Sequence, residues 1–227
     1  GQIKICLLRK MACGSQNLKL NNRIVVIDYG MGNIFSIQHS LKYLGYDSIL
    51  TSDPKTILSA KILILPGVGS FKSAMKKIGD MRLDVIIREA VLDNKIPILG
   101  ICLGMQLLTN SSTEGSSATK GLGLVNAKTI KLKNTHQKIK IPHIGFNNVE
   151  FDKDMSLFKG LTNNLDFYFI HSYMVVSDSK DFYRAYCDHY QRFIVAFENN
   201  NVYGVQFHPE KSQENGLKLL KNFLLKV

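Results

Sequence analysis

The chain has 227 residues, of which 45% are hydrophobic, and a formal net charge of +11. This length suits one α/β domain with a full core. The four cysteines lack the paired spacing of a zinc site or a disulfide framework, and no apolar run reaches the roughly 18 residues of a membrane span. We therefore expect a cytoplasmic protein with reduced thiols, no membrane association and no secretory signal.

The positive charge is unevenly distributed and raises the question of nucleic-acid binding. Residues 1–22 carry four Lys or Arg and no acid, and residues 115–149 carry six lysines and no acid. No recognised nucleic-acid motif accompanies them, and arginines are few. We expect no direct nucleic-acid contact. A solvated lysine-rich surface, or a face for a phosphorylated or acidic partner, is the simpler interpretation.

The first elements indicate the opening of a parallel sheet. Residues 1–22 lack a clear period and are interpreted as an extension of unknown role, before a single domain over 23–227. A β-branched strand is predicted over 23–28, followed by a glycine turn and a helix over 34–44 with Gly45 just past its end. The turn lacks the G-x-G-x-x-G pattern, which argues against a dinucleotide site.

Two further strands are predicted at 48–50 and 61–65. The second ends in Pro66-Gly-Val-Gly-Ser-Phe71, a glycine-rich loop without the Gly-Lys-Ser/Thr of a phosphate-binding loop. A plain turn without a functional role is the simplest interpretation of this loop. An amphipathic helix is predicted over 81–94 from the spacing of Val85, Ile86 and Ala90.

Residues 96–108 predict a buried strand, a sharp turn and a helix, with Cys102 at the turn. Gly100 and Gly104 flank this cysteine at positions −2 and +2, the spacing of a nucleophile elbow with sulfur in place of the hydroxyl. Glycines allow the close passage that such a turn needs, and the helix N-terminus behind it favours a thiolate. A buried structural cysteine beside two packing glycines is the alternative.

The rest of the chain is predicted to continue the sheet. A polar, exposed, mobile loop is expected over 109–120, an antiparallel hairpin over 122–133 and 138–142, and strands over 167–173, 182–187 and 193–197. A last helix is expected after Ser212, its N-cap, on the stripe of Leu217, Leu220 and Leu224.

A cysteine nucleophile needs a base, and the base needs an orienting group. His208 and Glu210 stand two residues apart at the end of an apolar segment, so both can project from one face. Glu210 can then accept a hydrogen bond from one imidazole nitrogen while the other faces Cys102. His171 is the chief rival as base, but no carboxylate stands two positions from it.

These stretches together resemble a known family. Gly100-Ile-Cys-Leu-Gly-Met-Gln106 with Gln206-Phe-His-Pro-Glu210 resembles the class I (triad) glutamine amidotransferases. The resemblance runs from about Arg23 to the C-terminus and is narrowed to the glutaminase subunits of imidazole glycerol phosphate synthases by further motifs, which are Asp28-Tyr-Gly-Met-Gly-Asn33, Pro66-Gly-Val-Gly-Ser-Phe71, Pro142-His-Ile-Gly-Phe-Asn147, Phe169-Ile-His-Ser-Tyr173 and Phe207-His-Pro-Glu-Lys-Ser212.

The resemblance implies a three-layer α/β/α fold with a central, mostly parallel sheet and a flanking antiparallel hairpin. It implies glutamine hydrolysis by Cys102, His208 and Glu210, without a cofactor or metal. The oxyanion donors would be the backbone N–H groups of Val68, Gly69 and Leu103. Contacts to the amino-acid end of glutamine would come from Gly67, Gln106, His171, Ser172 and Tyr173.

The resemblance also implies a heterodimer with a (β/α)₈-barrel cyclase that receives the ammonia in histidine biosynthesis. Asn33, Phe146, Tyr168 and Lys211 would lie at that interface, although an N-cap role for Asn33 and an ordinary exposed Lys211 are alternatives. The family has Trp where this chain has Phe146, and an acidic pair where it has only Glu114. The same glutaminase could therefore serve another synthase, such as a sugar amidation enzyme. A non-catalytic binding member of the fold and a hydrolase of γ-glutamyl peptides are further alternatives.

Overall fold

The computed structural model describes residues 23–115, 117–133, 141–163, 165–189 and 191–226. The expected extension over 1–22, and residues 138–140 of the expected hairpin, lie outside these ranges. In the described part of the chain, no helix is both long and apolar enough to cross a membrane.

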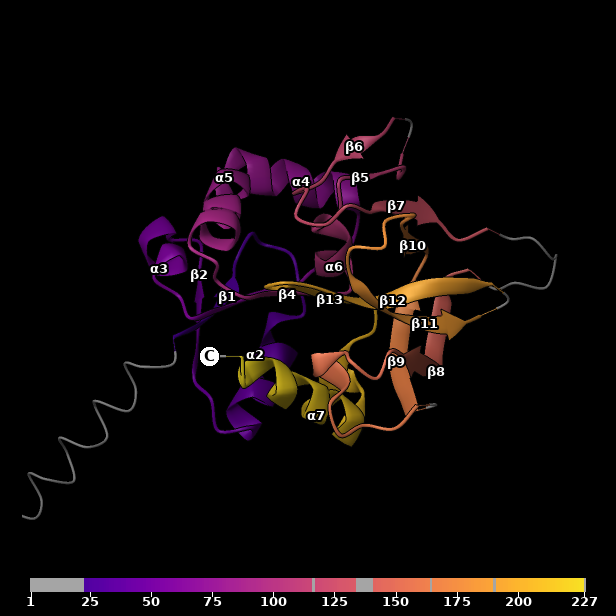
Figure 1. Ribbon diagram of the computed structural model, residues 1–227. Helices are drawn as coiled ribbons and strands as arrows, with labels where there is room; N and C mark the ends of the chain where they lie inside the picture. Colours follow the sequence, from indigo (N-terminus) through magenta and orange to yellow (C-terminus); the bar gives the residue numbers. More distant parts are fainter. Residues whose placement is uncertain (1–22, 116, 134–140, 164, 190, 227) are drawn as a thin grey trace, which may run out of the picture.

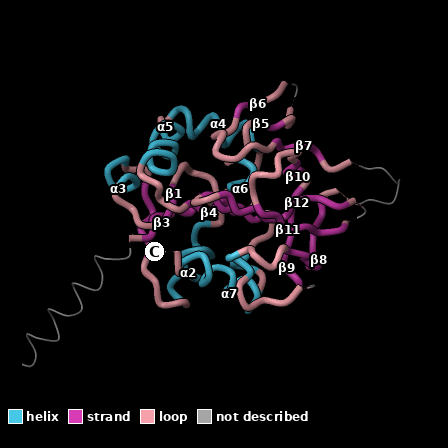
Figure 2. Tube along the Cα trace, viewed as in Figure 1, coloured by secondary structure: helices cyan, strands magenta, loops and turns pink. Residues whose placement is uncertain are grey.

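A central sheet separates two layers of helices (Figures 1 and 2). One layer holds α3 (Pro54–Leu58), α4 (Phe71–Asp80), α5 (Leu83–Arg88) and α6 (Leu103–Leu107), and the other holds α2 (Ile34–Tyr43) and α7 (Gln213–Leu224). The shorter helical turns are η1 (Glu89–Asp93), η2 (Ser156–Phe158) and η3 (Pro209–Lys211).

The centre of the sheet is parallel. Its strands, in spatial order, are β2 (Ser48–Thr51), β1 (Ile24–Ile27), β3 (Ile62–Leu65), β4 (Ile98–Ile101) and β13 (Val202–Val205). Beyond β13 the sheet continues through β12 (Arg192–Asn199), β10 (Tyr173–Val176), β7 (Lys128–Lys131), β5 (Ser111–Ser112) and β6 (Thr119–Lys120). In this second half every pair is antiparallel except β5 with β7. The predicted three-layer α/β/α fold is confirmed.

A long antiparallel ladder flanks this sheet. It consists of β8 (His143–Phe151), which pairs with β9 (Leu165–His171) and with β11 (Tyr183–Asp188), and β11 joins it to β12. The sequence predicts a hairpin over 122–133 and 138–142. In the structure the strand in the first of these ranges is β7, which begins at Lys128 and pairs with β10 (173–176).

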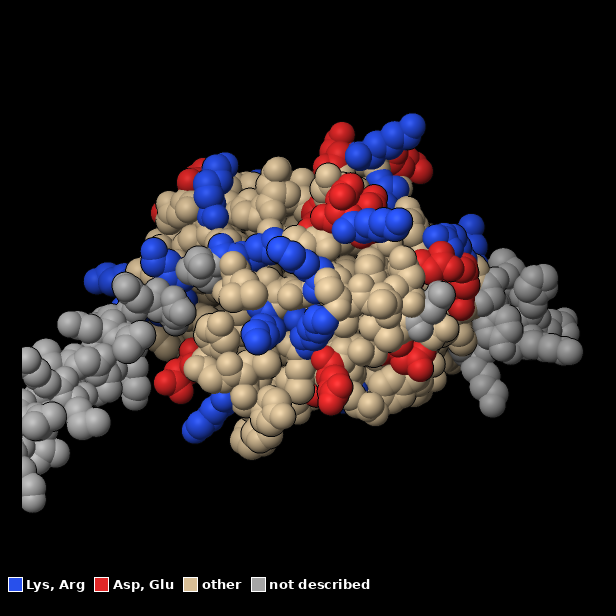
Figure 3. Space-filling model, turned by 60° about the horizontal axis from the view of Figure 1, so that its bottom comes forward, with Lys and Arg blue, Asp and Glu red and all other residues tan. Residues whose placement is uncertain are grey.

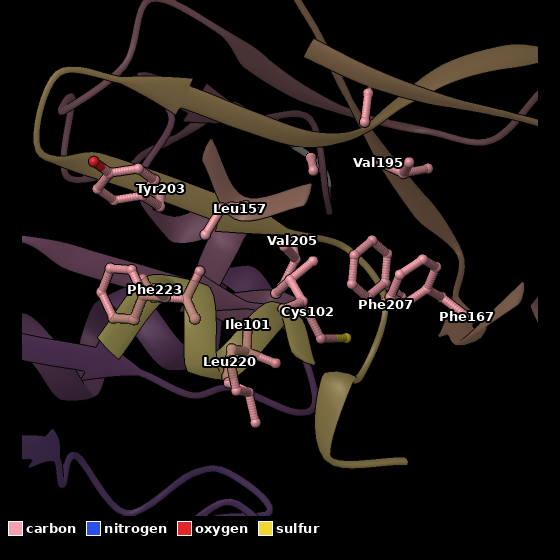
Figure 4. Packing of buried hydrophobic residues seen from close by; sticks show 14 of the residues in the cluster. Ile101, Cys102, Leu157, Phe167, Val195, Tyr203, Val205, Phe207, Leu220 and Phe223 are labelled. Atoms are coloured by element: carbon pink, nitrogen blue, oxygen red, sulfur yellow. The ribbon is translucent and has the colours of Figure 1, made fainter. Parts of the chain in front are cut away.

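The core has two halves because the central strands are buried on both faces. Side chains alternate along a strand, so Ile24 and Val26 of β1 pack toward α2 and α7, whereas Val25 and Ile27 pack toward the other helical layer. Figure 4 shows part of the first cluster, in which Cys102 lies beside Val205. This double burial explains the uninterrupted apolar runs in the sequence.

Aromatic rings fill the space between α7 and the β8–β9 ladder. The ring of Phe207 stacks on Phe167 with centroids 4.2 Å apart, and it meets Phe169 and Phe158 edge to face at 5.7 and 6.4 Å. All four rings are almost fully buried, and such pairs add to the stabilisation from area burial. Because Phe207 precedes His208, this packing also fixes the chain that leads into the candidate site.

The helix predicted over 81–94 differs from the observed one. The structure has α5 from Leu83 and the π turn η1, and it buries Leu83 and Ile87 while Val85 stays 47% exposed. Arg82 has a φ of 57° and resets the start of the helix. The preceding helix, α4, was not predicted, although its buried residues at i, i+3 and i+7 and its N-cap Ser70 are a helical signal.

The segment over 109–120 is also more ordered than expected. It contains β5 and β6, and Thr109 and Ser112 are fully buried. The Thr109 hydroxyl donates to the carbonyl of Gln106 at 2.7 Å, which ties the start of the segment to α6. The polar composition that predicted a loop instead provides hydrogen bonds inside the fold.

The lysine-rich character of the chain is visible on the face of α2 and α7. Turned toward the viewer in Figure 3, this face carries a band of Lys and Arg side chains across its middle. Lys218 and Lys221 of α7 are exposed on the outer side of their helix, while Leu219, Leu220 and Phe223 are buried. Part of the net positive charge of the chain therefore lies on the solvent-exposed face of α7.

We expect Phe207→Ala to lower the free energy of unfolding by about 3–5 kcal/mol, because the cavity left among the other rings cannot close. Urea unfolding followed by circular dichroism measures the change. Phe35→Ala is the matched control, since Phe35 is 81% exposed and its truncation should cost less than about 0.5 kcal/mol. Equal losses in the two variants would contradict this account of the aromatic core.

Candidate active site

The site lies where two neighbouring parallel strands end. Ile101 of β4 is in register with Val205 of β13, and the backbone N–H of Cys102 donates to the carbonyl of Val205 at 2.8 Å. The chain beyond both strands therefore emerges at one edge of the sheet. Cys102 and His208 both line a cavity of about 350 Å³ at this edge, within the size range of small-molecule sites.

The predicted strand–turn–helix around Cys102 is present. Cys102 has φ 55° and ψ −111°, a conformation rare for a residue with a side chain, and α6 begins at the next residue. A Cβ on Gly104 would lie 1.8 Å from the carbonyl oxygen of Leu65. Glycine at this position lets α6 pack directly against the end of β3, so the turn can present the sulfur to the cavity.

Glu210 orients His208. The Nδ1 atom of His208 lies 2.8 Å from Oε1 of Glu210, and both side chains are almost fully buried. The carboxylate accepts, so Nδ1 carries the proton. His208 Nε2 and Glu210 Oε2 have no hydrogen-bond partner among the described residues, which leaves Nε2 as the nitrogen available for chemistry.

The backbone on both sides of this pair is anchored. The N–H of His208 donates to the carbonyl of Tyr168 at 2.9 Å. The hydroxyl of Ser212 donates to the carbonyl of His208 at 2.6 Å and accepts from the N–H of Tyr168 at 2.9 Å. Ser212 occupies the predicted N-cap position of α7, but its side chain makes no capping bond to that helix. It connects β9 to η3 instead.

The environment of His208 favours the imidazolium form. Burial lowers the pKa of His208, but the interactions of its ring with Cys102 and with Glu210 outweigh burial and raise the pKa from its ordinary 6.5 to about 10. A protonated His208 beside Cys102 is the arrangement that supports a thiolate.

His171 is unsuited to act as the base. Its Nδ1 donates to the carbonyl of Tyr173 at 2.8 Å, and its Nε2 lies 3.0 Å from Nδ1 of His143. Both ring nitrogens are therefore engaged. Burial lowers the pKa of His171 to about 4, and burial together with the neighbouring His171 and His189 lowers that of His143 to about 3. The neutral ring of His171 lines the cavity, and the neutral ring of His143 holds it through their hydrogen bond.

The glycine-rich segment after β3 forms one wall of the cavity. Val68, Gly69 and Leu103, the predicted oxyanion donors, all line it, and Gly69 has a φ of 97° that favours glycine. Gly67 is the predicted pocket residue that does not line the cavity. It is buried behind the wall, where a Cβ would lie 2.7 Å from the hydroxyl oxygen of Tyr29.

Tyr29 supports this wall from behind. Its buried hydroxyl donates to the carbonyl of Pro66 at 2.8 Å. Burial first, and the charge of Cys102 second, raise the pKa of Tyr29 well above its usual value, so the hydroxyl keeps its proton and continues to donate. Tyr29 was not predicted as a site residue. Its position directly after β1 is the signal that could have found it.

The remaining predicted substrate contacts also line the cavity. They are Gln106, His171, Ser172 and Tyr173. The sequence had noted Glu114 only as half of an acidic pair, but it lines the same cavity and accepts a hydrogen bond from the N–H of Phe71. Pro142 and Ile170 also line the cavity. Both belong to motifs that carry the family resemblance, but neither was predicted as a site residue.

The residues predicted at a partner interface lie close to one another. Phe146 and Tyr168 are opposite each other on β8 and β9, with ring centroids 5.5 Å apart, and the ammonium of Lys211 lies 5.6 Å from the centre of the Tyr168 ring. Asn33 is the N-cap residue of α2, which contacts η3. Its side chain accepts from the hydroxyl of Ser36 at 3.0 Å and makes no capping bond to the helix backbone.

Size alone does not identify the site. A larger hollow of about 950 Å³ lies beside β11 and is lined by Arg184, Arg192 and several aromatic and acidic residues. Among the residues that the structure describes, its lining has no Cys or His, and Arg192 is already paired with Glu150 and Asp188 at 2.8 and 3.1 Å. The smaller cavity is lined by Cys102 and His208, and Glu210 lies behind His208 at 2.8 Å from its Nδ1 atom.

Comparison with known proteins agrees with this geometry. The family model described as "Glutamine amidotransferase class-I" matches residues 25–227. The chain is 48% identical over 201 residues to the imidazole glycerol phosphate synthase subunit HisH 2 of Methanococcus maripaludis, covering 88% of this chain and 98% of that protein. It is 47% identical over 205 residues to subunit HisH 1 of Parasynechococcus marenigrum, covering 89% and 97%.

Solved structures show the same fold at lower identity. PurLQS from Thermotoga maritima aligns with a TM-score of 0.68 at 17% identity, covering 90% of this chain and 98% of that chain. A glutamine amidotransferase from the same organism aligns with a TM-score of 0.58 at 19% identity, covering 90% and 84%. At such identities the likeness speaks for the fold alone.

The raised pKa of His208 predicts how stability depends on pH. A folded-state pKa of about 10 against an ordinary 6.5 means that protonated His208 stabilises the fold below pH 6.5, and that this contribution is lost as pH rises toward 10. Glu210→Gln weakens the interaction, so its free energy of unfolding should fall less steeply between pH 7 and 10. Urea unfolding at pH steps measures both slopes. The exposed substitution Glu214→Gln should keep the native slope, and equal slopes in all three proteins would refute the assignment.

Proposed function

The chain belongs to the class-I glutamine amidotransferases, and within them to the HisH subunits of imidazole glycerol phosphate synthase, and we propose that Cys102, His208 and Glu210 are the triad with which it hydrolyses glutamine. One observation carries the proposal. Cys102 and His208 line one cavity, and Glu210 holds the far nitrogen of His208 at 2.8 Å. These are the nucleophile, the base and the orienting group that acyl transfer requires.

The reaction begins on the sulfur. The thiol proton of Cys102 passes to Nε2 of His208, and Sγ attacks the side-chain amide carbon of glutamine. The carbonyl electrons move to the oxygen, where backbone N–H groups of Val68, Gly69 and Leu103 stabilise the charge. Each well-aimed donor is worth about 3–4 kcal/mol in such sites.

The second half releases both products. His208 gives its proton to the leaving nitrogen, and ammonia departs from a γ-glutamyl thioester on Cys102. His208 then takes a proton from water, which attacks the thioester and releases glutamate with a regenerated thiol. Glu210 stabilises the imidazolium in both steps and fixes the tautomer with the proton on Nδ1.

The cavity wall offers groups for the amino-acid end of the substrate. The Gln106 amide nitrogen already donates to the Tyr173 carbonyl at 3.1 Å and to Gln206 Oε1 at 2.8 Å. Its Oε1 is therefore the atom available to accept from the glutamine α-ammonium, with the Glu114 carboxylate nearby. Ser172 and the backbone of Tyr173 can bind the α-carboxylate. Gly67 contributes by holding the glycine segment against α6.

An exposed apolar strip beside the cavity suits a protein partner. We define the docking strip as Ile144, Phe146, Tyr168 and Ile170, which form the outward side of the β8–β9 ladder. Ile144, Phe146 and Ile170 are 57%, 50% and 41% exposed, and Ile170 also lines the cavity. Contiguous exposed apolar side chains mark interaction sites, and Lys211 next to Tyr168 would pair with an acidic partner residue.

The partner best fitting this arrangement is a (β/α)₈-barrel cyclase. The HisH relatives are named as subunits of imidazole glycerol phosphate synthase, so we propose that this chain forms a heterodimer with the cyclase and passes ammonia to it for histidine biosynthesis. Asn33 at the start of α2 extends the contact. A thiolate nucleophile needs reducing conditions, which favours a cytoplasmic location.

Cys102→Ala removes the nucleophile, and we expect it to lower glutamine hydrolysis by more than about 10³-fold while circular dichroism stays unchanged. Glutamate release in the presence of the partner measures the loss. Cys187→Ala is the matched control, because Cys187 is buried in β11 and burial raises its pKa to about 12. Persistent hydrolysis by Cys102→Ala would overturn the mechanism.

Ile144→Asp places a charge in the docking strip, opposite Ile170, and we expect its affinity for the cyclase to be about tenfold weaker. Ile144 does not line the cavity, so hydrolysis by the isolated chain should not change. Titration calorimetry and partner-stimulated glutamate release measure the two effects. Leu92→Asp is the control, because Leu92 is 39% exposed and lies on η1, outside the docking strip. This variant should bind the cyclase with native affinity. Unaltered affinity of Ile144→Asp would place the interface elsewhere.

A further inference from the structure

A chain of directed hydrogen bonds ends on the sulfur of Cys102. The amide nitrogen of Gln206 lies 3.8 Å from Sγ, within hydrogen-bond range for sulfur. Gln206 is fully buried and does not line the substrate cavity. Its backbone N–H donates to the carbonyl of Val195 at 2.8 Å, so both its main chain and its side chain are held.

The orientation of the Gln206 amide follows from its neighbours. The carbonyl of Tyr173 can only accept, so the group of Gln106 that faces it at 3.1 Å is the NH₂ group. That same nitrogen lies 2.8 Å from Gln206, and the atom of Gln206 that receives its second proton must be the oxygen. The NH₂ group of Gln206 is thereby turned toward Cys102.

Two histidines fix the far end of the chain. The Tyr173 carbonyl also accepts from Nδ1–H of His171, whose Nε2 is left to accept from Nδ1–H of His143. The other nitrogen of His143 is 3.4 Å from the amide nitrogen of Asn147 and must accept from it. Every donor and acceptor from Asn147 to Gln206 is thus assigned, and none can reverse without breaking a buried bond.

We propose that Gln206 is a fourth catalytic residue, which donates an amide hydrogen bond to the sulfur of Cys102 and stabilises the thiolate formed when the thiol proton moves to His208. A hydrogen bond to an ionised acceptor is stronger than one to its neutral form, so the contact favours the reactive state. The proposal rests on Cys102 as the nucleophile of the glutaminase. Gln106 acts through Gln206 as a positioning residue in addition to facing the substrate.

The proposal assigns different roles to Gln106 and Gln206, although both are buried. Gln106 lines the cavity and would contact substrate, whereas Gln206 touches only the sulfur side of the reaction. A substitution of Gln206 should therefore lower kcat with little change in KM for glutamine. A general loosening of the pocket would raise KM instead, which distinguishes a purely structural role.

The direct test is the pH dependence of Cys102 alkylation by iodoacetamide, measured on the isolated full-length chain without glutamine. Mass spectrometry of the peptide that contains Cys102 excludes contributions from the other cysteines. In Gln206→Met, which keeps the volume and loses the donor, we expect the half-maximal pH to rise by about one and the rate below it to fall about tenfold. Gln206→Asn keeps an amide but is one methylene too short, and it should shift in the same direction.

Gln38→Met is the matched control, since Gln38 is a half-buried residue of α2 whose amide donates to Ser48, remote from the cavity. Circular dichroism establishes that each variant is folded. An unchanged alkylation midpoint in folded Gln206→Met and Gln206→Asn would overturn the proposal, as would an equal shift in Gln38→Met. If the native chain hydrolyses no glutamine even with the cyclase, the proposed function fails, while the alkylation midpoints still decide the role of Gln206.

Discussion

The parallel pairing of β4 with β13 is the contact on which the site depends. The two strands are about a hundred residues apart in the sequence, yet the register of Ile101 with Val205 and the bond from Cys102 N–H to Val205 make their ends coincide. Parallel strands release their following residues at the same edge of the sheet. The register of these two strands therefore places the turn at Cys102 next to the His208-Pro-Glu210 segment.

Around that edge the fold supplies rigidity in layers. Phe207 stacks on Phe167 and meets Phe169 edge to face, Ser212 connects β9 to η3, and the Tyr29 hydroxyl donates to the carbonyl of Pro66 at the start of the glycine segment. Each of these contacts fixes backbone next to a reacting group. Such support would keep the proposed nucleophile, base and oxyanion donors in position without using the side chains that are proposed to contact substrate.

The polar groups of the site divide by protonation state. His143 and His171 are neutral, and donors and acceptors on both sides hold each of them in one tautomer. His208 faces Cys102 and the Glu210 carboxylate, which raise its pKa and so favour its charged form. Burial acts on all three rings in the same direction. What distinguishes them is the charge of the neighbour, which is why one histidine suits acid–base chemistry and the other two suit architecture.

Local features could be predicted from the amino-acid sequence: the sharp turn at Cys102, the spacing of His208 and Glu210, and the apolar runs of a sheet covered on both faces. Those signals are short-range, because turn geometry and strand alternation act over a few residues. The sequence analysis did not predict the start of α5 or the strand that pairs with β7, since each depends on what packs against it. It also left out α4, although the helical spacing and the N-cap of that helix are present in the sequence. The positions of Glu114, Tyr29 and Gln206 at the site follow from the folded arrangement, because hydrogen-bond partners far apart in the sequence are defined only when the strands pair in register.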